Sequence, residues 1–280
     1  MKIQRILSIS RPHFWIYEIG PYLLGLASTL PLLNELDVMT QTKVVIFFLY
    51  FLIPANIFIY GINDIFDYET DKHNPKKIAY ESLLMPSEHA SVWKIVLLTS
   101  VPFALLLDIS NTASIIAFLA FIFFALFYSA KPIRAKVRPG FDMIFSAGHY
   151  VATAFFSFAL ISEKYPPSKA LIGGMLWAMA MHAYSAVPDI QADEKSGIKT
   201  IATVLKHKPT IILCTLFYTI SALIAYSYIG SISLLLLIPY LFLMAISFNS
   251  NEERLFTIYT YFPPLNAVIG MVLFFIVIFL

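Results

Sequence analysis

The chain is built from long apolar runs that are separated by short polar segments. A helix needs about 20 mostly apolar residues to cross a bilayer. By this measure the sequence predicts nine membrane spans, although the third is short and only Gly230 separates the seventh from the eighth, so eight is the lower count. The expected spans are residues 14–33, 44–61, 92–107, 112–128, 141–161, 171–187, 210–229, 231–247 and 265–280.

The composition also indicates a membrane protein. Hydrophobic residues make up 59% of the chain and charged residues 13%, whereas a soluble domain is about half apolar and about a quarter charged. We therefore expect one all-α, polytopic membrane domain over residues 1–280, with membrane lipid and no nucleic acid around it. The single cysteine, Cys214, excludes an internal disulfide and a metal site built from cysteines.

A cluster of acidic residues directly follows the second apolar run. Asp64, Asp67 and Asp71 stand at positions i, i+3 and i+7. If the helix continues through them, these positions share one face, and the three carboxylates lie turn over turn. Their mutual repulsion indicates a cation among them. The hard-cation interpretation is Mg²⁺, which takes one or two carboxylates and completes its shell with substrate phosphates.

A second acidic pair follows the sixth apolar run, four spans later. Asp189 and Asp193 stand at i and i+4, and a basic segment follows this pair just as one follows the first cluster. This weak internal repeat predicts two pseudo-repeated halves around a central cavity, which would bring the two acidic motifs together. Membrane sites often lie at such repeat interfaces.

The distribution of positive charge predicts the orientation of the chain. With the amino terminus in the cytoplasm, 16 of the 19 Lys and Arg residues fall on cytoplasmic segments, and only Lys43, Lys164 and Lys169 fall outside. Cytoplasmic loops of membrane proteins carry such an excess. We therefore expect a multi-pass protein of the cell membrane, with both acidic motifs and the working face on the cytoplasmic side.

Acids and cations together at one membrane face suit a bound diphosphate. Mg²⁺ would lie between the five aspartates, and Asn63 would either ligate it through the amide oxygen or cap the end of the helix. Basic side chains would bind the outer phosphate oxygens, although lysines such as Lys206 and Lys208 are better explained as solvated loop charges. The candidate diphosphate-binding residues are Arg11, Lys131, Arg134, Lys136, Arg138 and Lys199.

The two motifs resemble those of a known family. Asn63-Asp64-x-x-Asp67-x-x-x-Asp71 and Asp189-x-x-x-Asp193 look like the paired aspartate-rich motifs of the UbiA superfamily of intramembrane prenyltransferases. Arg11-Pro12 and the basic segment 128–136 resemble other blocks of that family. The resemblance implies a nine-helix bundle with a lipid-facing cavity, Mg²⁺ as cofactor, an allylic diphosphate donor, and a metal-binding role for Asn63.

Within the superfamily, segments 67–77, 134–142 and 182–189 look most like the lycopene elongases of C50 carotenoid pathways. One departure concerns the region just after the first motif, where many relatives have an Arg-Pro pair and residues 78–82 have none. Lys76 or Lys77 would then supply the missing charge.

The chemistry implied by this resemblance begins when the C–O bond of the donor breaks toward an allylic cation. Such a cation needs a dry cavity and electron-rich walls, and aromatic faces attract cations by about 0.5–2 kcal/mol each. We expect catalytic roles for Asp64, Asp67, Asp189 and Tyr128, the last as one of four tyrosines beside the motifs. The other three tyrosines are Tyr60, Tyr68 and Tyr184.

No strong base stands out in the sequence, and either Asp67 or Asp189 would take the released proton. Glu18, His149 and His182 are polar residues inside predicted spans, where polar groups are costly and are candidates for function. Each has an alternative explanation: pairing with a cation for Glu18, and an interhelical hydrogen bond for the two histidines.

Several acceptors fit the same chemistry. The spans offer few polar residues to orient a polar acceptor, which favours a hydrocarbon such as lycopene receiving C5 dimethylallyl units. The alternatives are an aromatic quinone precursor, a chlorophyll-type alcohol and a glycerol phosphate lipid. A second alternative is a cation-coupled transporter, but that predicts acids near the middle of the membrane, and the aspartates stand at span ends. The sequence leaves the oligomeric state open.

Overall fold

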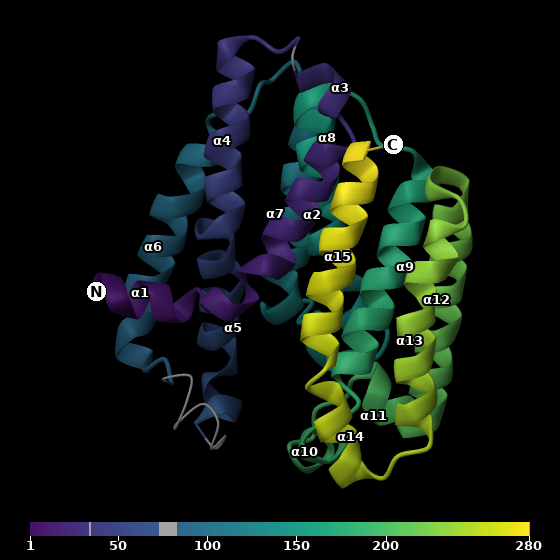
Figure 1. Cartoon of the computed structure of the whole chain (residues 1–280). Helices are drawn as coiled ribbons and strands as arrows, with labels where there is room; N and C mark the ends of the chain where they lie inside the picture. The colour runs from purple at the N-terminus through teal and green to yellow at the C-terminus, as the bar shows by residue number, and fades with distance from the viewer. Residues whose placement is uncertain (34, 73–82, 280) are drawn as a thin grey trace. The chain divides into compact units, whose positions relative to one another are not determined.

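A computed structural model describes residues 1–33, 35–72 and 83–279, and these ranges contain helices and loops but no strand. Lys76 and Lys77, and the departure from the family pattern at 78–82, lie outside the described residues. The helices are α1 (Ile3–Ile9), η1 (Pro12–Phe14), α2 (Trp15–Ala27), α3 (Leu30–Leu33), α4 (Val38–Leu52), α5 (Pro54–Asp71), α6 (Pro86–Ala104), α7 (Thr112–Ser129), η3 (Ala135–Val137), α8 (Phe141–Ser162), α9 (Ser168–Ser185), α10 (Ile190–Lys195), α11 (Ile201–Leu205), α12 (His207–Ile229), α13 (Ile232–Phe248), α14 (Glu252–Tyr259) and α15 (Phe262–Phe279) (Figure 1).

The all-α prediction is confirmed for this part of the chain. Five segments are long and apolar enough to cross a membrane, and helix Ile232–Phe248 is apolar but shorter. Every predicted span overlaps a helix, but the count of nine spans stays a prediction. The five long segments are Val38–Glu69, Thr112–Ser129, Phe141–Ser162, His207–Ile229 and Arg254–Phe279.

The chain divides into two compact units. The first comprises Met1–Arg134 with Ala152–Tyr165, and the second comprises Ala135–Val151 with Pro166–Leu280. Helix α8 therefore starts in the second unit and ends in the first. The layout of two pseudo-repeated halves around a cavity stays a prediction.

Aromatic residues form the core of the first unit. Phe47, Tyr50 and Phe51 of α4 are all fully buried, as are Phe121 of α7 and Phe156 of α8. The rings of Phe47 and Phe156 lie 4.6 Å apart, and those of Phe51 and Phe121 lie 5.2 Å apart. Such tilted and edge-on pairs add about 0.5–1.5 kcal/mol beyond the burial of their surface, and they join α4 to the helices around it.

The predicted second span contains a break that the apolar pattern does not reveal. Helix α4 ends at Leu52 and α5 begins at Pro54, which has no N–H for the ladder and fits the first position of a helix. Asn56 is fully buried, and its Nδ2 donates to the carbonyls of Phe51 at 3.1 Å and Leu52 at 3.0 Å. The side chain thus satisfies carbonyls at the break, where lipid offers no hydrogen bonds.

Helices α2 and α8 make close backbone contact within the first unit. A Cβ placed on Gly25 would lie 2.2 Å from the carbonyl oxygen of Ala154 and 2.2 Å from Oγ of Ser157. Only glycine fits there, because real Cβ atoms essentially never approach other atoms that closely. Small residues at helix interfaces are the usual means of close approach in membrane proteins.

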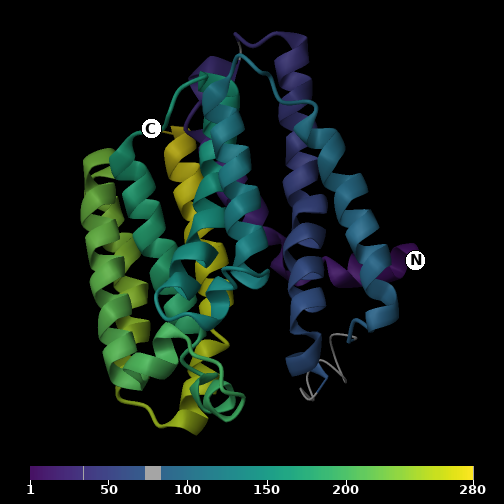
Figure 2. The same ribbon diagram turned by 180° about the vertical axis from the view of Figure 1, so that it is seen from behind.

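In the second unit, α12 packs against α9 and α13 along its length, as Figures 1 and 2 both show. The rings of Tyr218 on α12 and Tyr240 on α13 are stacked at 4.4 Å, and the Tyr240 hydroxyl donates to Oδ1 of Asn266 on α15 at 2.8 Å. The short helices α10, α11 and α14 gather at one end of this unit.

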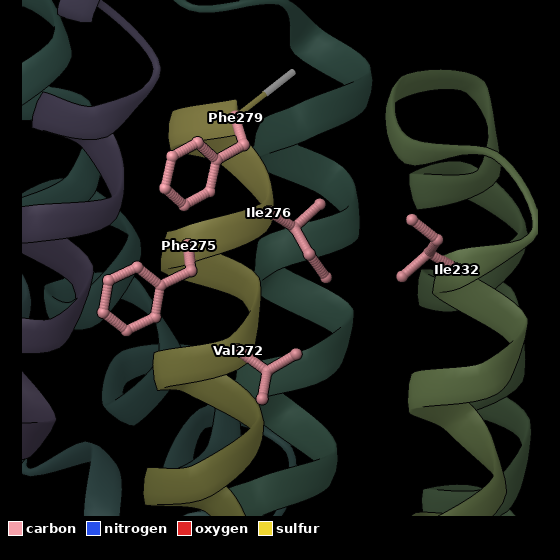
Figure 3. A pocket seen from close by; sticks show the side chains of 5 residues that line it. All are labelled: Ile232, Val272, Phe275, Ile276 and Phe279. Atoms are coloured by element: carbon pink, nitrogen blue, oxygen red, sulfur yellow. The ribbon is translucent and has the colours of Figure 1, made fainter.

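An apolar pocket of about 380 Å³ lies at the other end of the second unit, between the start of α13 and the end of α15 (Figure 3). Five apolar side chains line it: Ile232, Val272, Phe275, Ile276 and Phe279. Such a lining offers no partner to a phosphate group, so this pocket is suited to hydrocarbon and is not a candidate diphosphate site.

Candidate active site

The first acidic motif lies on the last two turns of α5. The helix continues through Asp71, as the spacing of the acids predicts. Asp64 and Asp67 are buried, with 8% and 5% of their surfaces exposed, whereas Asp71 is partly buried. Burial of carboxylates is costly unless a cation pairs with them. We therefore expect positively charged groups beside Asp64 and Asp67.

Each of these two buried carboxylates faces a guanidinium. Nη2 of Arg11 donates to Oδ1 of Asp64 at 2.7 Å, and Nη2 of Arg134 forms an ion pair with Oδ1 of Asp67 at 3.5 Å. The guanidinium of Arg11 also lies over the ring of Tyr60, 4.7 Å from its centre. Two of the predicted diphosphate-binding residues are thereby brought to the first motif.

Both arginines have the same unusual backbone conformation. Arg11 has φ 49° and Arg134 has φ 45°, in the left-handed region that residues other than glycine seldom adopt. Such a residue costs of order 1–3 kcal/mol and persists where its surroundings hold it in place. Here the strained residue in each case directs a guanidinium to an acid of the motif.

Asn63 connects the first motif to the end of α7. Its Nδ2 donates to Oγ of Ser129 at 3.0 Å. Tyr128, which precedes Ser129, is thereby placed at the same end of the first unit as the acids, as its predicted role requires. Lys131 follows shortly after and is exposed. The catalytic role of Tyr128 and the metal role of Asn63 stay predictions.

The second motif begins a new helix and does not extend the one before it. Helix α9 ends at Ser185, and Asp189 occupies the N-cap position of α10. The amide of Asp193 donates to the carbonyl of Asp189 at 2.9 Å, so the pair still spans one helical turn. Asp189 is exposed and Asp193 is partly buried.

The acids of the second unit influence one another. The pKa of Asp193 is raised to about 6, first by burial and then by the charges of Asp189 and Asp142, while the charge of Lys136 acts in the opposite direction. Asp142 is therefore a third acid beside the motif. Lys136, a predicted diphosphate ligand, is close enough for its charge to lower the pKa of Asp193. Arg138 and Lys199, also predicted ligands, are exposed.

Asp142 was not predicted from the sequence as a site residue. It is fully buried in the first turn of α8, and its Oδ2 accepts from the amide of Ile201 at 2.9 Å. Nε2 of His182 lies 3.8 Å from the same oxygen. Asp142 thus links α8, α9 and the segment that follows the second motif. The signal that could have found it is an acid at the start of an apolar run, the kind of position that singled out Glu18.

The donor set fits a hard divalent cation supplied together with phosphate. Among the described residues, no three His, Cys, Asp or Glu side chains lie close enough to hold a metal by themselves. Mg²⁺ usually takes only one or two carboxylates and fills its shell with water and phosphate oxygens. The guanidiniums beside Asp64 and Asp67, and the raised pKa of Asp193, mark both motifs as places where positive charge is favourable.

The two motifs belong to different units, and their meeting across a shared cavity stays a prediction. Within the first unit the structure brings together Asn63, Asp64, Asp67, Arg11 and Arg134. Within the second it brings together Asp189, Asp193, Asp142 and Lys136.

Comparison with known proteins gives a consistent picture. Residues 19–253 match the model of the UbiA prenyltransferase family. The chain is 35% identical to a lycopene elongase/hydratase of Haloarcula japonica, over 95% of this chain and 88% of the relative. It is 36% identical to a lycopene elongase/hydratase of Halobacterium salinarum, over 94% and 93% of the two chains.

Solved structures support the fold. A UbiA homologue from Archaeoglobus fulgidus, whose structure contains GPP and Mg²⁺, has a TM-score of 0.72 at 18% identity and covers 96% of this chain and 99% of its own. An apo UbiA homologue from Aeropyrum pernix has a TM-score of 0.70 at 14% identity, over 94% and 98% of the two chains. The family model and the two lycopene elongase/hydratases place this chain in the UbiA prenyltransferase family, as a multi-pass membrane prenyltransferase.

Proposed function

We propose that this enzyme transfers the C5 dimethylallyl group of an allylic diphosphate to lycopene or a closely related carotenoid, with Mg²⁺ as cofactor. The observation that carries the proposal is the identity of 35% and 36%, over nearly the whole chain, to two proteins named lycopene elongase/hydratase. The polar groups of the first unit add chemical support, because acids and guanidiniums gather at the end of α5 beside an apolar helix bundle.

The residues that would hold Mg²⁺ are Asn63, Asp64, Asp67 and Asp71 of the first motif, together with Asp189 and Asp193 of the second. A bound divalent cation stabilises the negative charge that grows on the leaving diphosphate. Arg11 and Arg134 lie beside Asp64 and Asp67, and they would bind phosphate oxygens of a diphosphate held at that motif. Lys131, Lys136, Arg138 and Lys199 would add donors around the rest of the diphosphate.

The protein's own groups then govern the departure of the leaving group. The guanidiniums of Arg11 and Arg134 neutralise the diphosphate as the C–O bond breaks, which lowers the energy of the charge-separated state. The ring of Tyr60 lies under Arg11 and the ring of Phe14 lies 5.7 Å from Tyr60, so aromatic faces stand close to the first motif. Tyr128 would add a further ring beside the allylic cation.

A hydrocarbon acceptor agrees with the apolar character of both units. An aromatic quinone precursor, a chlorophyll-type alcohol or a glycerol phosphate lipid remains the alternative acceptor within the same chemistry. Membership of a prenyltransferase family disfavours the transporter alternative.

The bias of Lys and Arg predicts that both motifs lie at the cytoplasmic face, where a water-soluble diphosphate is available. Membranes that contain the protein, incubated with labelled dimethylallyl diphosphate, Mg²⁺ and lycopene, should form labelled C45 and C50 carotenoids. Parallel incubations with geranyl, farnesyl and geranylgeranyl diphosphate test the donor length. A labelled quinone precursor or glycerol phosphate lipid, with no labelled carotenoid, would overturn the choice of acceptor.

A further inference from the structure

Helix α1 presents an apolar strip that the described part of the chain leaves uncovered. Ile6 and Ile9, three positions apart, pack against the hydrophobic core of the first unit, and Ile9 is buried. Ile3 and Leu7 stand at i and i+4 and therefore share a second face of the helix. Their exposed fractions are 76% and 37%. The core contacts of α1 thus leave two large apolar side chains on the surface, in one row.

A third face of α1 is polar. Gln4 and Ser8 also stand at i and i+4, and both are exposed. The outward half of the helix is therefore divided along its length into an apolar row and a polar row. A helix that lies in the surface of a bilayer has this division, because one side contacts acyl chains and the other contacts water. A helix surrounded by water on its outward side has no need of the apolar row.

The direction of α1 agrees with a position in the membrane plane. Figures 1 and 2 both show α1 lying crosswise to α5 and α6, its neighbours in the first unit. Helix α5 belongs to a segment that is long and apolar enough to cross a membrane. A helix that lies across a membrane-spanning helix runs along the bilayer, and its exposed side chains all lie at a similar depth.

The contacts of α1 place it where α5 changes from apolar to charged. A Cβ placed on Gly61 would lie 3.5 Å from Cγ2 of Ile9. Shortly after α1, Arg11 donates to Asp64, the first charged residue of α5. A charged side chain is costly in the hydrocarbon region, so this level of α5 corresponds to the boundary between acyl chains and headgroups. Helix α1 lies at the same level.

The protein itself fixes the orientation of α1. Nε and Nη2 of Arg5 donate to the carboxylate of Glu88 at 3.0 and 2.8 Å. At the other end of the helix, Ser10 is fully buried, and its carbonyl accepts from Nε1 of Trp15 at 3.1 Å. The apolar row is therefore held outward by contacts on the inner side of the helix, as a preformed face.

We propose that α1 is an in-plane membrane-surface helix whose partner is the phospholipid bilayer. Ile3 and Leu7 lie among the acyl chains, and Gln4 and Ser8 face water. Lys2, exposed at the N-cap of α1, is placed to contact lipid phosphates. This inference goes beyond prenyl transfer and does not depend on it. It fixes the level of the bilayer surface relative to the first acidic motif.

The test measures the depth of single nitroxide labels on the full chain in phospholipid nanodiscs. Ile3→Cys, Leu7→Cys, Gln4→Cys and Ser8→Cys are labelled one at a time, and each label is probed with oxygen, which concentrates in hydrocarbon, and with a water-soluble nickel chelate. Labels at positions 3 and 7 should collide mainly with oxygen and lie about 5–10 Å inside the headgroup boundary. Labels at positions 4 and 8 should collide mainly with the nickel chelate.

Three further samples calibrate the measurement. Wild type gives the background, because its cysteine, Cys214, is fully buried. Leu119→Cys, at a 58% exposed position near the middle of α7, supplies the hydrocarbon reference. Lys164→Cys, at an exposed position between α8 and α9, supplies the water reference.

Two results would overturn the proposal. If labels at positions 3 and 7 collide with nickel as strongly as the label at position 164, the apolar row lies in water. If they are shielded from both reagents, protein and not lipid covers the row. Where one labelled variant does not fold, the other position of the same row decides. The measurement needs no turnover, so its outcome is separate from that of the proposed function.

Discussion

Arg11 and Asp64 form an ion pair at the first motif, with Nη2 and Oδ1 separated by 2.7 Å. The guanidinium lies at the same time over the ring of Tyr60. A single strained residue before α2 thus brings positive charge to the helix that carries the acids. In the proposed function, an incoming diphosphate with Mg²⁺ would replace both partners: the cation would take the place of Arg11 at the carboxylate, and the phosphate would take the place of the carboxylate at Arg11.

Loss of the Arg11 charge should therefore impair prenyl transfer more than folding. We expect Arg11→Gln to lower kcat/KM for the donor by about 100-fold, the effect of losing one charged hydrogen bond of about 2–3 kcal/mol in the transition state. Arg11→Lys should recover part of this loss, because lysine keeps the charge but not the planar geometry. Steady-state assays at several donor concentrations measure the effect.

Arg5 offers a control for the Arg11 series. Its Nε and Nη2 donate to the two carboxylate oxygens of Glu88 at 3.0 and 2.8 Å, so it is also a paired arginine near the amino terminus. Arg5→Gln should cost about 1 kcal/mol of stability or less and leave kcat/KM near the wild-type value. Equal losses of activity in the Arg5 and Arg11 variants would contradict a specific role for Arg11.

The acids of the two motifs should be needed for Mg²⁺-dependent turnover. Asp64→Ala and Asp189→Ala, made singly, are each expected to abolish prenyl transfer while the protein stays folded in membranes, since each removes a proposed metal ligand. Activity as a function of Mg²⁺ concentration and detergent-extracted yield are the two measurements. Full activity in either variant would disprove the two-motif site.

The raised pKa of Asp193 predicts a pH dependence. Because this pKa rises to about 6 in the folded protein, the contribution of Asp193 to the stability of the metal-free protein is favourable at low pH and is lost as the pH rises through about 6. Protonation competes with metal, so Mg²⁺ should stabilise the protein more at pH 7 than at pH 5. Thermal unfolding with and without Mg²⁺ at the two pH values tests this expectation.

Asp142→Asn tests how much the charge of Asp142, as distinct from burial and Asp189, contributes to the raised pKa of Asp193. The charge of Asp142 is one reason for the raised pKa of Asp193, so its removal should move the pH midpoint of the Mg²⁺ effect to a lower value. The asparagine oxygen can still accept from the amide of Ile201, which preserves the fold locally. An unchanged midpoint would show that Asp142 does not influence the second motif.

The contact at Gly25 should be sensitive to a single methyl group. Gly25→Ala places a carbon 2.2 Å from two atoms of α8, and overpacking of this kind costs about 1–3 kcal/mol. Gly270 on α15 has nothing within 4 Å of the corresponding position, so Gly270→Ala should be neutral or slightly stabilising. The difference in apparent Tm between the two variants measures the contact.

The sequence reveals the first motif well because its information is local. Asp64, Asp67 and Asp71 have helical spacing, and α5 continues through all three. The break at Pro54 is hidden, because the apolar run continues across it and Asn56 compensates for it through a buried side chain. Hydropathy averages over such a break, whereas proline at the first helical position marks it.

Contacts between distant segments were not predictable in the same way. The partners of Arg11 and Arg134 depend on tertiary packing and on a left-handed backbone that the sequence does not favour for arginine. The contacts of Asp142 could not be predicted, because its partners, Ile201 and His182, are far away in the chain. The sequence predicts which charges are present at the site, but only the fold shows which of them pair.

The break between α4 and α5 divides one hydrophobic stretch of 32 residues into a helix that carries core aromatic residues and a helix that carries the acids. Helix α5 begins at Pro54 and packs on α6 and α7. Its direction is therefore not set by a continuous helix through α4. Substitutions that reshape α4 can accumulate without tilting the carboxylates out of position. In such a stretch, the half that carries the acids can keep its direction while the other half diverges in sequence.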